Sequence, residues 1–136
     1  MNTIITSQRI ATNQRISHTA RLFGLNFPMR LEPMVFATAD RLSYEYQGGM
    51  WIFSSLSTGG FFMFPDSEEP FHVSCENGFE GELSAEAFGI VCCLYAYSNL
   101  SFSGDAFADV CSVHFHKLRD FSLGHPEAGS IFQAID

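Results

Sequence analysis

The stretch FHVSCENGFEGEL, residues 71–83, decides the fold because apolar and polar side chains alternate on both sides of its centre. A period of two is typical of a half-buried β-strand, so the pattern predicts strands over residues 71–75 and 79–83. The dipeptide Asn77-Gly78 between them is a strong turn signal. The stretch therefore predicts an antiparallel β-hairpin.

The loop of this hairpin is set by which side chains must share a face. A two-residue loop would place Glu80 and Glu82 opposite core residues. A three-residue loop, residues 76–78, puts every apolar side chain on one face and the carboxylates on the other. We therefore predict the longer loop, with Gly78 in the left-handed conformation that such loops need.

Two apolar stretches before the hairpin, residues 50–56 and 60–64, predict two more strands. Helical periodicity and end signals predict helices at residues 17–23, ended by Gly24; 33–46, ended by Gly48; 85–99, capped by Ser84; 106–123, capped by Asp105; and from Pro126 onward. The sequence thus predicts a single α+β domain over residues 16–136, with a four-stranded antiparallel sheet flanked by helices before and after it in sequence. Residues 1–15 are polar without a clean period, which predicts a mobile or loosely packed arm.

The composition favours a folded domain inside the cell. Of 136 residues, 46% are hydrophobic and fifteen are phenylalanine, enough for a substantial core. No apolar run approaches the ~20 residues that span a bilayer. The first thirty residues lack the apolar segment of a signal peptide, which predicts a cytoplasmic protein with reduced cysteines.

The net charge of −8 is unevenly distributed. Residues 1–41 hold five arginines against two acids, whereas residues 42–136 hold one lysine and one arginine against thirteen acids. Nucleic-acid binding requires clustered cations, so direct DNA binding is improbable. A basic protein partner is easier to reconcile with this distribution, although an acidic surface can also be merely solvated.

Two acidic groups are candidate partner contacts. The first is the loop of Asp66, Glu68 and Glu69, and the second is the polar hairpin face of Glu76, Glu80 and Glu82. His72 shares that face, so a small hydrolase using His72, Glu80 and Glu82 is an alternative reading.

No cofactor or metal is expected. His114 and His116 point to opposite sides of a helix, and the cysteine spacings match no zinc template. His114 falls on the apolar stripe of its helix, which predicts a core histidine with its hydrogen bonds satisfied.

Three strings of residues carry a family resemblance. They are YQGGMWIF at residues 46–53 with GGFFM at 59–63, NGFEGELSA at 77–85, and LRDF at 118–121 with HPEA at 125–128 and IFQAID at 131–136. In this order, over about Ile16 to Asp136, the chain resembles the ArdB/KlcA family of plasmid-borne antirestriction proteins. The resemblance implies a non-enzymatic protein that protects incoming DNA from type I restriction-modification enzymes.

The number of acids narrows the mechanism that the resemblance implies. B-DNA carries about two charges per base pair, so imitating ten base pairs would need roughly twenty carboxylates on one side. This chain has fifteen in all. We therefore expect inhibition through contact with the type I enzyme or an associated host protein, or by an indirect route, rather than full DNA mimicry.

Overall fold

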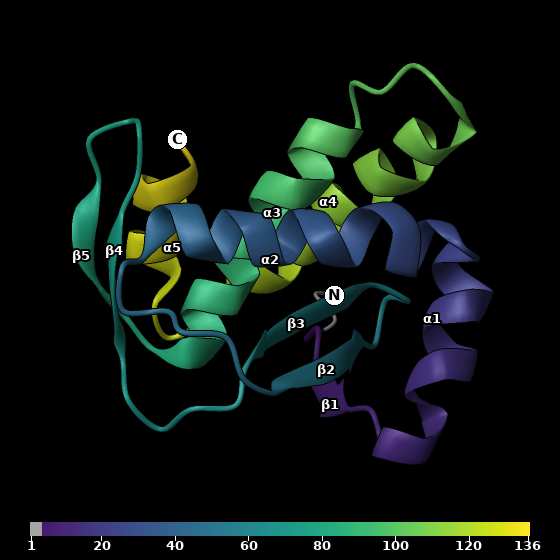
Figure 1. The fold of residues 1–136 in the computed structure, drawn as a ribbon, viewed down its shortest axis with the longest axis horizontal. Helices are drawn as coiled ribbons and strands as arrows, with labels where there is room; N and C mark the ends of the chain where they lie inside the picture. The colour runs from purple at the N-terminus through teal and green to yellow at the C-terminus, as the bar shows by residue number, and fades with distance from the viewer. Residues whose placement is uncertain (1–3) are drawn as a thin grey trace.

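A computed structural model describes residues 4–136 of the chain. Five α-helices and five strands make up most of these residues (Figure 1). In chain order they are β1 (Ser7–Arg9), α1 (Arg15–Phe23), α2 (Glu32–Leu42), β2 (Trp51–Leu56), β3 (Phe61–Pro65), β4 (Phe71–Ser74), β5 (Glu80–Leu83), α3 (Ala85–Leu100), α4 (Ala106–Ser122) and α5 (Ala128–Ile135). A short 3₁₀ turn, Thr12–Gln14, precedes α1, and a π-helix, Phe27–Leu31, precedes α2.

The α+β class is confirmed, but the single four-stranded sheet is wrong. The strands form two separate antiparallel sheets, one with the order β1-β2-β3 and the other consisting of β4 and β5 (Figure 1). Between them the chain runs through residues 66–70. Pro65, at the end of β3, and Pro70, before β4, cannot donate backbone hydrogen bonds to a continuing ladder. The hairpin leaves the first sheet there and packs on α3 and α5 instead.

The N-terminal segment contributes the fifth strand. Ser7–Arg9 pairs with Ser54–Leu56 of β2, and the amide of Ile10 donates to the carbonyl of Phe53 at 2.8 Å. The expectation of a loosely packed arm therefore does not hold for residues 7–10, while residues 1–3 of that arm lie outside the described residues. The side chains of β1 are all exposed, so no hydrophobic alternation marks the strand in the sequence.

The local end signals of the helices are mostly confirmed. Gly24 ends α1 with a φ of +61°, and the side chains of Ser84 and Asp105 accept hydrogen bonds at the starts of α3 and α4. The helix predicted over 33–46 differs, because α2 begins at Glu32 and already ends at Leu42. The last helix begins two residues after Pro126.

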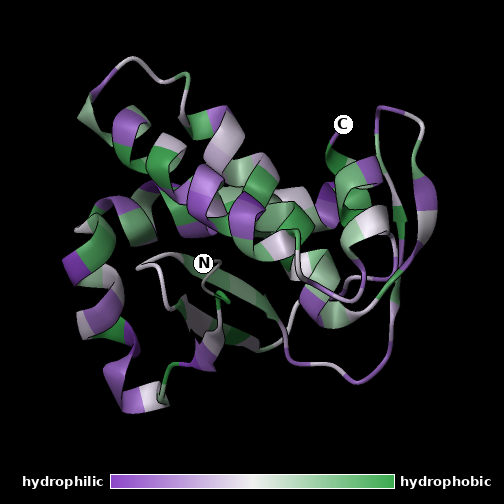
Figure 2. Ribbon diagram, turned by 180° about the vertical axis from the view of Figure 1, so that it is seen from behind, coloured by the Kyte–Doolittle hydropathy of each residue, from purple (hydrophilic) through white to green (hydrophobic). Residues whose placement is uncertain are grey.

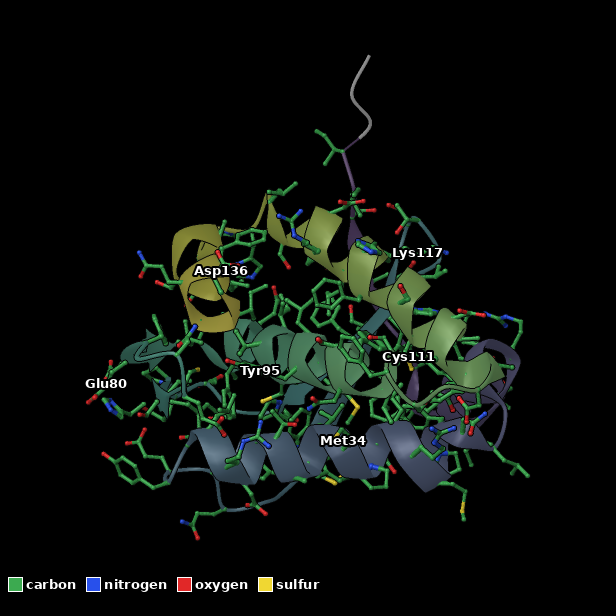
Figure 3. The ribbon with its side chains drawn as sticks, turned by 90° about the horizontal axis from the view of Figure 1, so that it is seen from above. Met34, Glu80, Tyr95, Cys111, Lys117 and Asp136 are labelled. Carbon is green, nitrogen blue, oxygen red and sulfur yellow. The ribbon has the colours of Figure 1, made fainter. Side chains whose placement is uncertain are left out.

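Helix α3 is the centre of the core. It lies between α2 and α4 (Figure 3), and its face toward the sheet packs so closely that a Cβ on Gly89 would lie 2.4 Å from the Met63 carbonyl oxygen. Twelve of the 16 residues of α3 are buried, and they lie on every side of the helix, as in a helix that is apolar all round. The loop leading into the β4–β5 hairpin is, in contrast to α3, mostly hydrophilic (Figure 2). No helix among residues 4–136 is long and apolar enough to cross a membrane.

Candidate functional site

The β4–β5 hairpin carries the predicted three-residue loop. Phe71 pairs with Leu83 and His72 with Glu82, and beyond the ladder the Cys75 amide donates to the Phe79 carbonyl at 2.9 Å. Gly78 has a φ of +96°, which confirms the left-handed position. One face of the hairpin is consequently apolar and buried, and the other presents carboxylates to solvent.

His72 stands at the centre of the polar face. Its Nε2 lies 3.0 Å from Oε2 of Glu80, which is diagonal to it, although its register partner is Glu82. The strand register places Glu82 opposite His72, but Glu80 is the residue that the imidazole contacts. The backbone N–H of His72 donates to the carboxylate of Glu45, and the ring of Tyr44 lies 5.8 Å from the imidazole.

Glu45 joins this face to the acidic loop. It lines an open cleft of about 330 Å³, together with Met50 and the loop residues Asp66 and Glu69. The Asp66 amide donates to the Met50 carbonyl at 2.8 Å, which fixes the start of the loop against residues 47–50. Glu45 was not among the predicted contact residues, because its position indicated the end of a helix. Its contact with His72, 27 residues further along the chain, leaves no local signal in the sequence.

The remaining predicted contact residues lie at the edges of this surface. Glu68 is exposed in the loop but does not line the cleft. Glu76 is at the hairpin tip, 3.6 Å from Nε of Arg41 on α2, and its side chain is 87% exposed. The structure thus gathers Glu45, Asp66, Glu69, Glu80 and Glu82 around one end of the molecule, with Glu68 and Glu76 beside them. We call these seven residues the acidic end.

A second polar network connects residues of the resemblance strings to one another. Asn77 donates from Nδ2 to the carbonyls of Gln133 and Ala134, at 3.0 and 3.2 Å, which fastens the hairpin tip to α5. The carboxylate of Glu127 accepts from both the amide and the hydroxyl of Ser84, the N-cap of α3. These contacts hold the hairpin, α3 and α5 together. Some residues of the resemblance strings therefore stabilise the fold and do not form a binding surface.

His125 completes this network. Its Nδ1 accepts from the Glu127 amide at 3.0 Å, so the ring hydrogen lies on Nε2, which faces Glu86 at 2.9 Å. The His125 side chain is only 5% exposed. The pair therefore links the turn between α4 and α5 to the first turn of α3.

The buried titratable groups elsewhere are core residues. Cys75, Cys92, Cys93 and Cys111 are buried and unbridged, and burial raises the pKa of Cys93 to about 12. His114 is in the core as predicted, but its hydrogen bonding is not satisfied, because Nδ1 has no partner. Burial first, and the charge of Lys117 second, lower its pKa to about 4. Within residues 4–136, no three His, Cys, Asp or Glu side chains are placed to hold a metal ion.

Comparison with known proteins identifies the family. The family model described as antirestriction protein matches residues 44–136. The chain belongs to the antirestriction protein family. It is 41% identical to an antirestriction protein KlcA of Escherichia coli over 97% of this chain and 95% of that protein. It is also 34% identical to the putative antirestriction protein YubI of Escherichia coli K12, over 90% of this chain and 89% of that one.

The fold is shared with a solved structure over the full length of both chains, with a TM-score of 0.92 and 41% sequence identity. That structure comes from work on KlcA and ArdB, which describes a novel fold and antirestriction activity against type I DNA restriction systems in vivo but not in vitro. The ArdB/KlcA resemblance of the sequence is confirmed. The comparisons name no catalytic activity, and the hydrolase alternative receives no support from them.

Proposed function

We propose that this protein protects unmodified DNA from type I restriction-modification enzymes inside a bacterial cell. The observation that carries the proposal is the full-length match, in sequence and in fold, to a protein described as active against these systems in vivo. Membership of the antirestriction family points in the same direction.

The protein acts through contact with another protein, or indirectly, rather than by imitating or binding DNA. The acidic end holds seven carboxylates, whereas a ten-base-pair mimic would present roughly twenty. Several cations are already engaged within the molecule: Arg30 pairs with Asp105 at 2.8 Å, and the Arg15 guanidinium lies 3.6 Å from the centre of the Phe53 ring. The acidic end therefore does not resemble a DNA duplex, and the engaged arginines do not form a DNA-binding groove.

The contact surface is the acidic end. It combines the hairpin-face residues Glu76, Glu80 and Glu82 with the loop residues Asp66, Glu68 and Glu69, and Glu45 lies between the two groups. Because these side chains are exposed, each contributes little alone in physiological salt, and a basic partner would be recognised by their sum.

The proposal is tested first in cells. Bacteria with an active type I system are transformed with unmodified and with modified plasmid, with and without expression of this protein. Expression should raise the transformation efficiency of the unmodified plasmid toward that of the modified one. Unchanged restriction at good soluble expression contradicts the proposed function.

The contact surface is tested with two matched triple variants. The first changes Glu76, Glu80 and Glu82 to Gln, and the second changes Asp66 to Asn together with Glu68 and Glu69 to Gln. Circular dichroism confirms that each is folded. We expect a partial loss of protection in each variant, because each removes three of seven charges. Full protection in both would remove the acidic end from the mechanism, and complete loss in one alone would assign the contact to that group.

A further inference from the structure

A second surface, distant from the acidic end, has the properties of a binding site. An open apolar groove of about 570 Å³ lies between α1, the π-helix and β2. We call it the α1 groove. Its apolar lining includes Ile16, Ala20, Leu25, Phe27, Pro28 and Phe53. Helix α1 and the β4–β5 hairpin are at opposite ends of the molecule in Figure 1, so the two surfaces are separate.

The rim of the α1 groove consists of apolar side chains that are unusually exposed to solvent. The relative exposures of Ile16 and Leu25 are 85% and 82%, and Met29 on the adjoining π-helix is 73% exposed. Single exposed apolar residues are ordinary, but several around one apolar groove mark an interaction site. A small ligand inside the groove would leave these rim side chains in water, whereas a protein segment laid across it would cover them.

The groove also contains a carboxylate that has no ion-pair partner in direct contact among residues 4–136. Glu32 lines it, and no described residue makes an ion pair with Glu32 within 4.0 Å. Arg15 also lines the groove, but its guanidinium is directed away from a salt bridge with Glu32: it stacks on Phe53, and Nη1 donates to the Trp51 carbonyl at 3.1 Å. Partial burial raises the pKa of Glu32, and the charge of Arg15 only partly opposes this. A cation delivered by a partner would stabilise the carboxylate.

One wall of the groove is irregular backbone. Phe27 and Pro28 belong to the π-helix Phe27–Leu31, which runs directly into α2. π-helical turns are rare in proteins and occur frequently at functional sites. Here the π-helix carries the aromatic floor of the groove and places Glu32 immediately after it.

We propose that the α1 groove binds a segment of another protein that presents a bulky apolar side chain next to a lysine or arginine. The apolar side chain fills the groove between Ile16 and Leu25, and the cation pairs with Glu32. A second copy of this chain is disfavoured as the occupant, because two molecules of net charge −8 repel each other. The inference is independent of the antirestriction proposal, and its test requires no restriction enzyme.

The test is an NMR titration of the ¹⁵N-labelled protein with two synthetic peptides, acetyl-Leu-Leu-Lys-amide and acetyl-Leu-Leu-Glu-amide. Saturable shifts should appear at the amides of Ile16, Ala20 and Leu25. The lysine peptide should bind about threefold to fivefold more tightly than the glutamate peptide, the range expected for one partly exposed ion pair. Glu32→Gln should remove most of this preference and leave the residual apolar binding.

Two variants separate the groove from general surface apolarity. Leu25→Asp should abolish the shifts, whereas Leu123→Asp, which changes a leucine that is 61% exposed on another surface, should leave them intact. Both substitutions are at exposed positions, and circular dichroism confirms folding. The proposal is overturned if no shift appears up to the solubility limit of the peptides, if both peptides bind equally, or if sedimentation shows a dimer that Leu25→Asp dissociates.

Discussion

The buried histidine of α4 makes the stability of this protein depend on pH in a defined window. His114 is 5% exposed and packs against Phe23, with ring centres 4.7 Å apart, and against Tyr97. Its pKa of about 4 in the folded protein lies below the ordinary value of 6.5. The folded state therefore prefers the neutral ring, while the unfolded chain takes up a proton below pH 6.5.

The size of the effect follows from this difference. A pKa change of one unit corresponds to about 1.4 kcal/mol, so His114 should lower the free energy of unfolding by on the order of 3 kcal/mol between pH 6.5 and pH 4. The sign is fixed because the unfolded state binds more protons in this window. Below pH 4 both states are protonated and the contribution levels off.

The assay is urea denaturation at half-unit pH intervals from 7 to 4, for the wild type and for His114→Leu. The variant removes the titrating group and also the Nδ1 atom that has no hydrogen-bond partner, so at pH 7 it should be about as stable as the wild type. The difference between the two curves should grow by on the order of 3 kcal/mol as the pH falls. Parallel curves would refute the reasoning.

Three further predictions concern packing and backbone geometry, and urea denaturation measures each. Gly89→Ala should lower the free energy of unfolding by about 3 kcal/mol, because its Cβ would lie 2.2 Å from the Cβ of Phe64. The control Gly129→Ala on α5, with open space around it, should cost nothing, and equal effects would contradict the close packing of α3 on β3. Gly78→Val should cost about 1–2 kcal/mol through its positive φ alone, since nothing lies within 4 Å, and an unchanged midpoint would argue against the left-handed loop. Glu127→Ala should cost about 1–3 kcal/mol by removing two hydrogen bonds from the cap of α3, and a neutral effect would show that water replaces them.

The sequence predicted what local physics determines. Ser84 and Asp105 cap helices through hydrogen bonds that span three residues, and the hairpin register follows from the parity of neighbouring side chains. These features need no knowledge of distant residues. Gly89 was a missed signal, because a glycine inside an otherwise apolar helix often marks a close backbone approach.

The features that sequence analysis missed depend on distant contacts. The strand β1 is held by the free edge of β2, more than forty residues away, and its own side chains are exposed. The division into two sheets depends on where the hairpin packs. The alternation of polar and apolar residues along a strand does not contain that information. Likewise, Glu45 joins the candidate contact surface only because the chain folds it against His72.

The claim that this protein protects DNA without imitating it is tested most directly by competition for a purified type I enzyme. A labelled DNA duplex is bound to the enzyme, and its fluorescence anisotropy is followed as the protein is added, with unlabelled duplex as the positive control. The account predicts that the anisotropy stays at its bound value at concentrations of protein far above that of the enzyme. Stoichiometric displacement of the duplex, weakened by added salt, would contradict it and establish DNA mimicry.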